Sequence, residues 1–207
     1  MKKLLLVLFI SFGLIGSANA NSIKGAFGYN LGDVDKSIET KEEFLASWFY
    51  YAWKTFTPKN PVPFFDSYRV RATPISHRIY EIEASKSIKE KSKGVQYDWC
   101  EYGSGLSFSD LLAILRARYG DVFDKVVHKY DRGTYSDGIN WHTRHYALKY
   151  TDKNRYIHLS CRHKASSIYS YELSLKYVDT YLEDLEDIEY TELKNKKILE
   201  ESSDYDL

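Results

Sequence analysis

The chain has 207 residues, 29 basic and 29 acidic side chains, and a mean hydropathy of −0.47. This length suffices for one domain with a sizeable core. The charge is too balanced for a nucleic-acid-binding surface, which needs a strongly basic face. Aromatic residues make up 16% of the chain, a share that favours strands and broad half-buried faces.

The first 20 residues have the layout of a secretory signal peptide. Lys2 and Lys3 precede an apolar run from Leu4 to Ile15, and small residues close the segment at 18–20. The apolar run is too short to span a membrane comfortably, and no later stretch is apolar enough to do so. We expect cleavage after Ala20, a mature chain of 187 residues (207 less 20), and a bacterial periplasmic or secreted location.

Two elements are expected before the first hairpin. Residues 23–34 predict a short strand, and their three glycines do not have the spacing of a dinucleotide fingerprint; we assign Gly28 and Gly32 to a bulge and a turn. The polar stretch 33–43 predicts a loop or one helical turn. Residues 48–56 are strongly β-prone and aromatic on both faces, which predicts a covered central strand or an aromatic ligand platform.

The clearest pattern in the chain is a hairpin over residues 67–84. Apolar and polar side chains alternate on both arms, and a proline opens the loop at 73–77. A five-residue loop gives the register Ala72 opposite Arg78, Val70 opposite Tyr80, Tyr68 opposite Ile82 and Arg69 opposite Glu81. Arg69 and Arg71 then lie on the polar face, either as an anion-binding patch or as part of a solvated face with a cross-strand ion pair.

Residues 85–94 are rich in lysine and predict a loop or a frayed helix. A capping signal at 107–110 precedes apolar residues at helical spacing up to Tyr119, and Gly120 ends this core-facing helix. A strand at 122–130 and a loop at 131–140 are expected next.

Three strands follow as a meander, at 144–150, 155–163 and 169–177. A four-residue turn at 151–154 sets Leu148 opposite Ile157 and Tyr146 opposite Leu159.

A capping box at Thr180 opens a final helix that runs to about Glu200, and residues 202–207 are expected to be disordered. The segment from Thr180 onward carries a net charge of −7, against +5 for residues 21–179. Its narrow apolar stripe is formed by Leu182, Leu185 and Ile188. We expect it to dock loosely near Lys149, Arg155 or Arg162; a solvated segment with no role is the alternative.

These elements predict an α+β fold in a single domain over residues 21–201. Its main part is an antiparallel meander sheet, with one core helix after the first strands and a C-terminal helix.

Cys100 and Cys161 are the only cysteines, and in an oxidising compartment they predict one disulfide. It would close a loop of about 60 residues and contribute roughly 4 kcal/mol of stability. Two free thiols with a redox role are the alternative, although no C-x-x-C motif is present.

Six histidines raise the question of a metal site. The expected register sets His142 opposite His163, and two imidazoles facing each other across a sheet could hold zinc. His145 and His158 point to the other face and cannot supply a third ligand. The sequence therefore predicts no metal site and no cofactor.

The segments GAFGYNLGDV (25–34) and PKNPVPFFDSYRVRATPISHRIYEIEA (58–84) resemble a family of small exported bacterial proteins. That family is marked by a GxFGxxLG opening, a PKxP connector and a TPxxHxIY hairpin. The resemblance implies the fold and export, and it assigns no site residue.

No G-x-S-x-G, P-loop or paired-cysteine metal motif is present, and no catalytic triad can be nominated. We therefore expect an exported, non-enzymatic binding protein with a protein or cell-envelope partner. The candidate binding residues are Arg69, Arg71, Arg155 and Arg162. A hydrolase-like periplasmic enzyme is the alternative, and it would need a pocket with clustered, pKa-shifted side chains.

Overall fold

The computed structural model describes residues 22–44, 48–62, 65–90, 108–134, 140–165 and 169–203. The predicted signal peptide, Cys100 and the last four residues lie outside these ranges.

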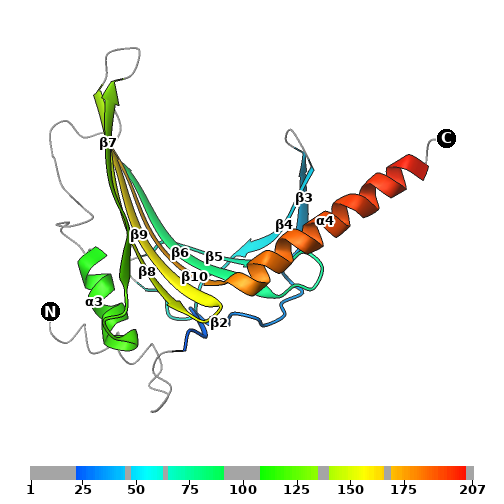
Figure 1. Cartoon of the computed structure of the whole chain (residues 1–207), viewed down its shortest axis with the longest axis horizontal. Helices are drawn as coiled ribbons and strands as arrows, with labels where there is room; N and C mark the ends of the chain where they lie inside the picture. The colour runs from blue at the N-terminus through cyan, green and yellow to red at the C-terminus, as the bar shows by residue number, and fades with distance from the viewer. Residues whose placement is uncertain are drawn as a thin grey trace.

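The described residues form an α+β domain built on an eight-stranded antiparallel sheet, which confirms the predicted fold class (Figure 1). The sheet order is β3-β4-β5-β6-β10-β9-β8-β7, and β1 and β2 form a separate two-stranded sheet. The strands are β1 (Gly25–Ala26), β2 (Tyr29–Asn30), β3 (Thr40–Phe44), β4 (Trp48–Thr55), β5 (Ser67–Ala72), β6 (Ile79–Glu90), β7 (Asp124–Thr134), β8 (Asn140–Asp152), β9 (Arg155–Ala165) and β10 (Tyr169–Asp179). The helices are α3 (Phe108–Tyr119) and α4 (Thr180–Ser203).

The pairing of β6 with β10 joins the two halves of the chain at the middle of the sheet. It explains why residues 85–90 are a strand rather than the predicted loop or frayed helix: Ile88 lies opposite Tyr171, and the pairing continues to Glu90. In the same way, β7 reaches Thr134 and β8 begins at Asn140, so these ends of the predicted 131–140 loop are paired strand. Long-range pairing thus overrides local composition.

The β5–β6 hairpin has the predicted faces in β5 and from Glu81 onward in β6, but Ile79 and Tyr80 exchange sides and the register differs from the prediction. Val70 lies opposite Ile82 and Arg69 opposite Glu83, and the register shifts between Arg71 and Ala72. The cause is a bulge at Tyr80, since Arg71 pairs with Glu81 while Ala72 pairs with Ile79. The extra residue leaves Ile79 in the main core and Tyr80 outside that cluster, although only 2% exposed.

The β8–β9 turn is also tighter than predicted. Asp152 pairs with Arg155, so the connection has two residues, and Lys153 adopts a positive φ of 53°. The four-residue turn was therefore wrong, and the register moves by two residues: Leu148 lies opposite Leu159, and Tyr150 lies opposite Ile157. The faces are unchanged, because a shift of two preserves the side-chain alternation.

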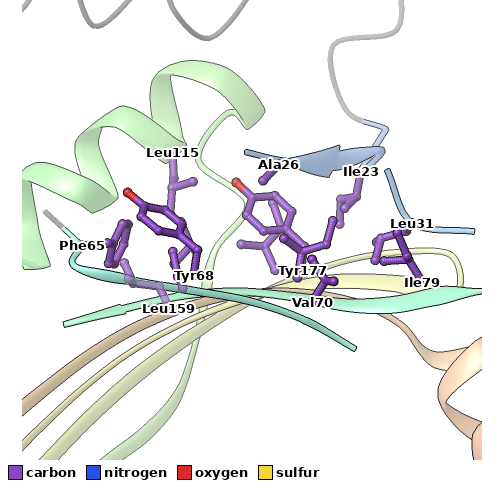
Figure 2. Packing of buried hydrophobic residues seen from close by; sticks show 14 of the residues in the cluster. Ile23, Ala26, Leu31, Phe65, Tyr68, Val70, Ile79, Leu115, Leu159 and Tyr177 are labelled. Carbon is purple, nitrogen blue, oxygen red and sulfur yellow. The ribbon is translucent and has the colours of Figure 1, made fainter. Parts of the chain in front are cut away.

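The main core lies between one face of the sheet, α3 and the N-terminal segment (Figure 2). The predicted helix is confirmed: its inward side chains Leu111, Leu115 and Tyr119 are buried, and it ends before Gly120, which has a φ of 88°. In the N-terminal segment, Gly25 is required by close packing, because an added Cβ would lie 2.2 Å from the Tyr29 carbonyl oxygen. Gly28 and Gly32, for which a bulge and a turn were predicted, both lie in turns with positive φ, 95° and 92°.

Helix α4 follows directly from β10 and lies along β4, β6 and β10, with its C-terminal end extending away from the sheet (Figure 1). Its first turn is capped by Asp179, whose Oδ1 accepts a hydrogen bond from the Leu182 amide at 3.3 Å. The predicted cap, Thr180, instead donates its hydroxyl to the Asn154 carbonyl at 2.9 Å. The helix continues to Ser203, three residues past the predicted end.

Candidate functional site

The most strongly charged part of the sheet lies on the face opposite the main core. Five side chains on three neighbouring strands form what we call the charged ladder: Arg69 and Arg71 on β5, Glu81 and Glu83 on β6, and Lys176 on β10. The strand order places the two carboxylates between the cations. The anion-binding candidates Arg69 and Arg71 are therefore already opposite acidic partners.

Short contacts hold the charged ladder together. The Arg69 guanidinium donates directly to the Glu83 carboxylate, and Ser174 Oγ donates to the other oxygen of Glu83 at 2.9 Å. Lys176 Nζ lies 3.5 Å from Glu81 Oε2 and 3.7 Å from Glu83 Oε1. Arg71 Nη1 lies 3.9 Å from Glu81 Oε2.

The two carboxylates of the charged ladder are buried, whereas its three cations keep 30–40% of their side-chain surface exposed. Glu81 is 4% and Glu83 is 8% exposed, so both carboxylates have lost most of their water. Burial by itself raises the pKa of Glu83, but the charges of Lys176 and Arg69 and the hydrogen bond from Ser174 outweigh it and lower the pKa below its usual range. On the face that was expected to be solvated, the carboxylates are thus covered and the arginines partly exposed, and the cross-strand ion pairs are present.

The N-terminal half of α4 adds two more carboxylates to this face. Burial raises the pKa of both Glu183 and Glu186, and the charge of Glu81 raises that of Glu183 further. Arg71 acts in the opposite direction on both, and Tyr80 hydrogen-bonds Glu186. Four carboxylates therefore share the three cations of the charged ladder, and α4 packs on a face that carries a surplus of negative charge.

A third acidic residue of α4 fixes the helix to the β5–β6 loop. The Glu189 side chain accepts hydrogen bonds from the backbone amides of Ile75 and Ser76, at 2.7 and 3.0 Å from Oε2. Glu189 is 7% exposed, whereas Ile188, which the sequence placed on the docking stripe, is 64% exposed. Of the predicted apolar stripe, Leu182 is buried and Leu185 half-buried, so the docking of α4 combines these apolar contacts with the hydrogen bonds of Glu189.

Arg155 joins three parts of the chain. Its guanidinium donates to Asp179 Oδ2 at 2.9 Å, to the Ile23 carbonyl at 2.9 Å and to the Leu31 carbonyl at 3.0 Å. It therefore ties the N-terminal segment to the end of β10, where α4 begins. All three bonds are internal, which supports a structural role.

The predicted docking position of α4 is only partly right. The helix lies along β4, β6 and β10, while Lys149 is on β8 and Arg162 is exposed on β9. Arg155 does meet the start of the helix, through Asp179. The four candidate binding residues are therefore not gathered at one site: Arg69 and Arg71 belong to the charged ladder, and Arg155 and Arg162 lie on β9.

The outward face of α4 is apolar at several positions. Tyr181, Ile188 and Leu199 are 65%, 64% and 69% exposed, and at 3.6 residues per turn they lie within about 20° of one another around the helix axis. Ile198, 52% exposed, flanks them. We call these four residues the α4 stripe.

Neither the histidines nor the cysteines form a metal centre within the described residues, where no group of three or more potential ligands is placed to bind an ion. The predicted pairing of His142 with His163 was wrong: His142 lies opposite Ala165 and His163 opposite Arg144, because of the tighter β8–β9 turn. Cys161 is buried and is not a free thiol. Since Cys100 lies outside the described ranges, the disulfide between them stays a prediction.

Comparison of the chain with protein-family models, curated proteins and solved structures returned no match. The resemblance to an exported bacterial family therefore stays a prediction. No helix among the described residues is long and apolar enough to cross a membrane.

Sequence reasoning missed Lys176 and Glu189. Lys176 could not be found, because its place beside Glu83 depends on the pairing of two strands that are far apart in sequence. Glu189 left a signal: it lies seven residues after Leu182 and four before Leu193, on the inward side of the helix. An acidic residue at such a position indicates a specific hydrogen-bond partner.

Proposed function

We propose that this chain is an exported, non-enzymatic binding protein and that its partner binds at the α4 stripe. The observation that carries the proposal is the distribution of exposed apolar side chains. Seven large apolar side chains of the described residues are exposed, and four of them, including the three most exposed, lie on α4. Scattered exposed apolar residues need no explanation, but a row along one helix face is typical of an interaction surface.

The mode of docking also supports this assignment. A helix whose only task is to cover a sheet places its apolar stripe inward. In α4 the buried Leu182 and the half-buried Leu185 and Leu193 share the inward side with Glu186 and Glu189, whereas Tyr181 and Ile188 are exposed. The stripe is thus available on a helix that is itself held in place.

The charged ladder is better explained as the surface on which α4 docks than as an active site. A catalytic carboxylate must reach a substrate, but Glu81 and Glu83 are nearly fully buried and are engaged by Arg69, Arg71 and Lys176. Structural ion-pair networks perturb pKa values as active sites do. Export itself is inferred from residues 1–20 and from the family resemblance.

The experiment is a pull-down from periplasmic extract of the source bacterium, with the purified mature protein as bait. The wild-type protein should retain a specific partner, and Leu199→Glu should lose it, because a charge enters the apolar contact. Val122→Glu, at a side chain 37% exposed and outside α4, is the matched control and should retain the partner. Equal retention by the Leu199 variant would contradict the proposed surface.

Localisation needs a separate measurement. Mass spectrometry of the protein from the envelope fraction should show an N-terminus at Asn21. A chain that retains Met1 would overturn export while leaving the α4 surface to be judged by the pull-down.

A further inference from the structure

We infer that the partner of the α4 stripe is a second copy of this chain, and that two α4 helices pair in antiparallel orientation. This inference rests on the proposed function, since it names the partner of the same surface. It is drawn from the charge distribution along α4, the spacing of the α4 stripe and the position of the helix at the margin of the molecule.

The charges of α4 divide the helix into two complementary halves. Its N-terminal part, residues 180–192, carries six acidic side chains and no basic one: Glu183, Asp184, Glu186, Asp187, Glu189 and Glu192. Its C-terminal part, residues 193–203, carries all three lysines of the helix, Lys194, Lys196 and Lys197, together with Glu200 and Glu201, for a net charge of +1. Antiparallel pairing sets the acidic half of each copy beside the lysines of the other, whereas parallel pairing sets acid beside acid.

The α4 stripe has the spacing that antiparallel pairing requires. Tyr181 and Leu199 are equally far from Tyr190, so a two-fold axis near Tyr190 places each Tyr181 opposite the partner's Leu199. The same axis brings the two Ile188 side chains within about one helical turn of each other at the centre. The apolar contact would extend over about 27 Å, the length of 18 helical residues.

The acidic half of α4 also decides against a lipid surface as the partner. A helix that lies on an anionic membrane carries lysine and arginine along its polar face. Here Asp184, Asp187 and Glu192 are exposed around Ile188, and they would be repelled by anionic headgroups. A second copy offers both an apolar stripe and lysines.

The position of α4 leaves room for this pairing. The helix runs along the margin of the molecule, and its C-terminal end extends beyond the sheet (Figure 1). Ile198 and Leu199 lie in the last two turns of α4 and are more than half exposed. A second helix can approach them without displacing the contacts of Leu182 and Glu189.

The first test is the mass of the purified mature protein in solution, measured by sedimentation equilibrium over a range of concentrations. A monomer–dimer equilibrium is expected. Ile188→Glu should raise the dissociation constant by at least about tenfold, because the substitution acts in both copies. Lys196→Glu should raise it several-fold. Val122→Glu and Lys153→Glu, matched controls outside α4, should leave it unchanged, and circular dichroism should show that all variants are folded.

The orientation is tested by cross-linking, with the native cysteines left in place. A mixture of Tyr181→Cys and Leu199→Cys chains should form a disulfide-linked pair under mild oxidation. Tyr181→Cys chains alone should not, because their introduced thiols would be about 27 Å apart, far beyond disulfide reach. Efficient cross-linking of Tyr181→Cys chains to each other would overturn the antiparallel arrangement.

Other outcomes separate this inference from the proposed function. A chain that is monomeric at every concentration overturns the self-pairing, even if its capture of another protein from extract still depends on Leu199. A monomer that cosediments with phosphatidylglycerol vesicles would assign the stripe to a membrane and also overturn it. If Ile188→Glu leaves the dissociation constant of the dimer unchanged, the interface lies elsewhere and pairing through the α4 stripe is also overturned.

Discussion

On one face of the sheet Val70, Ile82 and Leu159 are fully buried beneath α3 and the N-terminal segment, whereas on the other face the side chains beneath α4 include Arg71 and Glu81. The first face is closed by apolar contacts, which are non-directional and lose little when charges change. The second is closed by ion pairs and a few hydrogen bonds, whose strength depends on geometry and pH. The sheet is therefore covered on one side by an apolar layer and on the other by α4, whose docking depends on ion pairs and hydrogen bonds.

The largest effect should come from the apolar face. Leu159→Ala is expected to lower the free energy of unfolding by about 2–5 kcal/mol, because the side chain is fully buried and its removal leaves a cavity. Val122→Ala, at an exposed side chain, should change it by less than about 0.5 kcal/mol. Urea unfolding measures both. A small loss for Leu159→Ala would mean that this face is not the main source of stability.

The predicted disulfide would add stability on the apolar face of the sheet. Cys161 follows Ile157 and Leu159 by alternate residues on β9, so reduction should loosen the apolar side and lower stability by roughly 2–5 kcal/mol. Thiol alkylation before and after reduction, followed by mass spectrometry, shows whether Cys100 and Cys161 are paired. Two reactive thiols in the freshly isolated protein would refute the bond.

Arg155 and Arg162 both lie on β9, and substituting each shows how much stability an internal hydrogen-bond network contributes relative to an exposed side chain. Arg155→Ala should cost about 2–3 kcal/mol, since it leaves Asp179 and the carbonyls of Ile23 and Leu31 without their donor. Arg162→Ala should be nearly neutral in stability, because its side chain is exposed. Thermal unfolding distinguishes the two. Equal costs would show that the Arg155 bonds do not hold the N-terminal segment.

A smaller effect, on the docking of α4, is expected from a substitution at Glu189. Glu189→Ala removes the acceptor for the amides of Ile75 and Ser76 and should weaken the docking of α4 by about 1–2 kcal/mol. Amide hydrogen exchange should speed up in α4 and at these two amides but not in β9. Glu192→Ala, an exposed position one turn later, is the control. Unchanged exchange at Ile75 and Ser76 would exclude Glu189 as the anchor.

The smallest effect should be that of pH on the docking of α4. Because the pKa values of Glu183 and Glu186 are raised, the docked state binds more protons than the undocked one. Docking should therefore tighten as the pH falls from neutral toward the ordinary glutamate pKa of 4.5, and weaken as the pH rises through the raised values. Below that range Glu83 becomes protonated; because Lys176, Arg69 and Ser174 of the sheet lower its pKa, its protonation should lower the stability of the sheet itself.

Hydrogen exchange of α4, corrected for the intrinsic effect of pH on amide exchange, measures this trend. Glu183→Gln and Glu186→Gln together should tighten docking at neutral pH and flatten the dependence. A helix that loosens steadily from neutral pH to 4.5 would contradict the electrostatic account of its docking.

Local patterns in the sequence determined the elements whose signals lie within a few residues. The alternation in β5, and in β6 from Glu81 onward, set which side chains face the core, and the helical spacing from Phe108 to Tyr119, with Gly120 after it, set α3. The start of α4 was visible as well, although Asp179 rather than Thr180 caps it. Such features depend on propensity and periodicity, which neighbouring residues alone express.

Only the tertiary structure decided the registers, the partner strands and the inward side of α4. One inserted residue at Tyr80 moved the cross-strand partners and exchanged the sides of Ile79 and Tyr80, which the local alternation did not reveal. A turn two residues shorter moved the partners of β8 and β9 without changing their alternation, so the pattern could not reveal it either. The pairing of β6 with β10 created the charged ladder from residues about 90 positions apart. Burial of the Glu189 carboxylate costs free energy, and hydrogen bonds from the amides of Ile75 and Ser76 offset this cost. The inward position of Glu189 on the helix is therefore favourable only when the β5–β6 loop is in place.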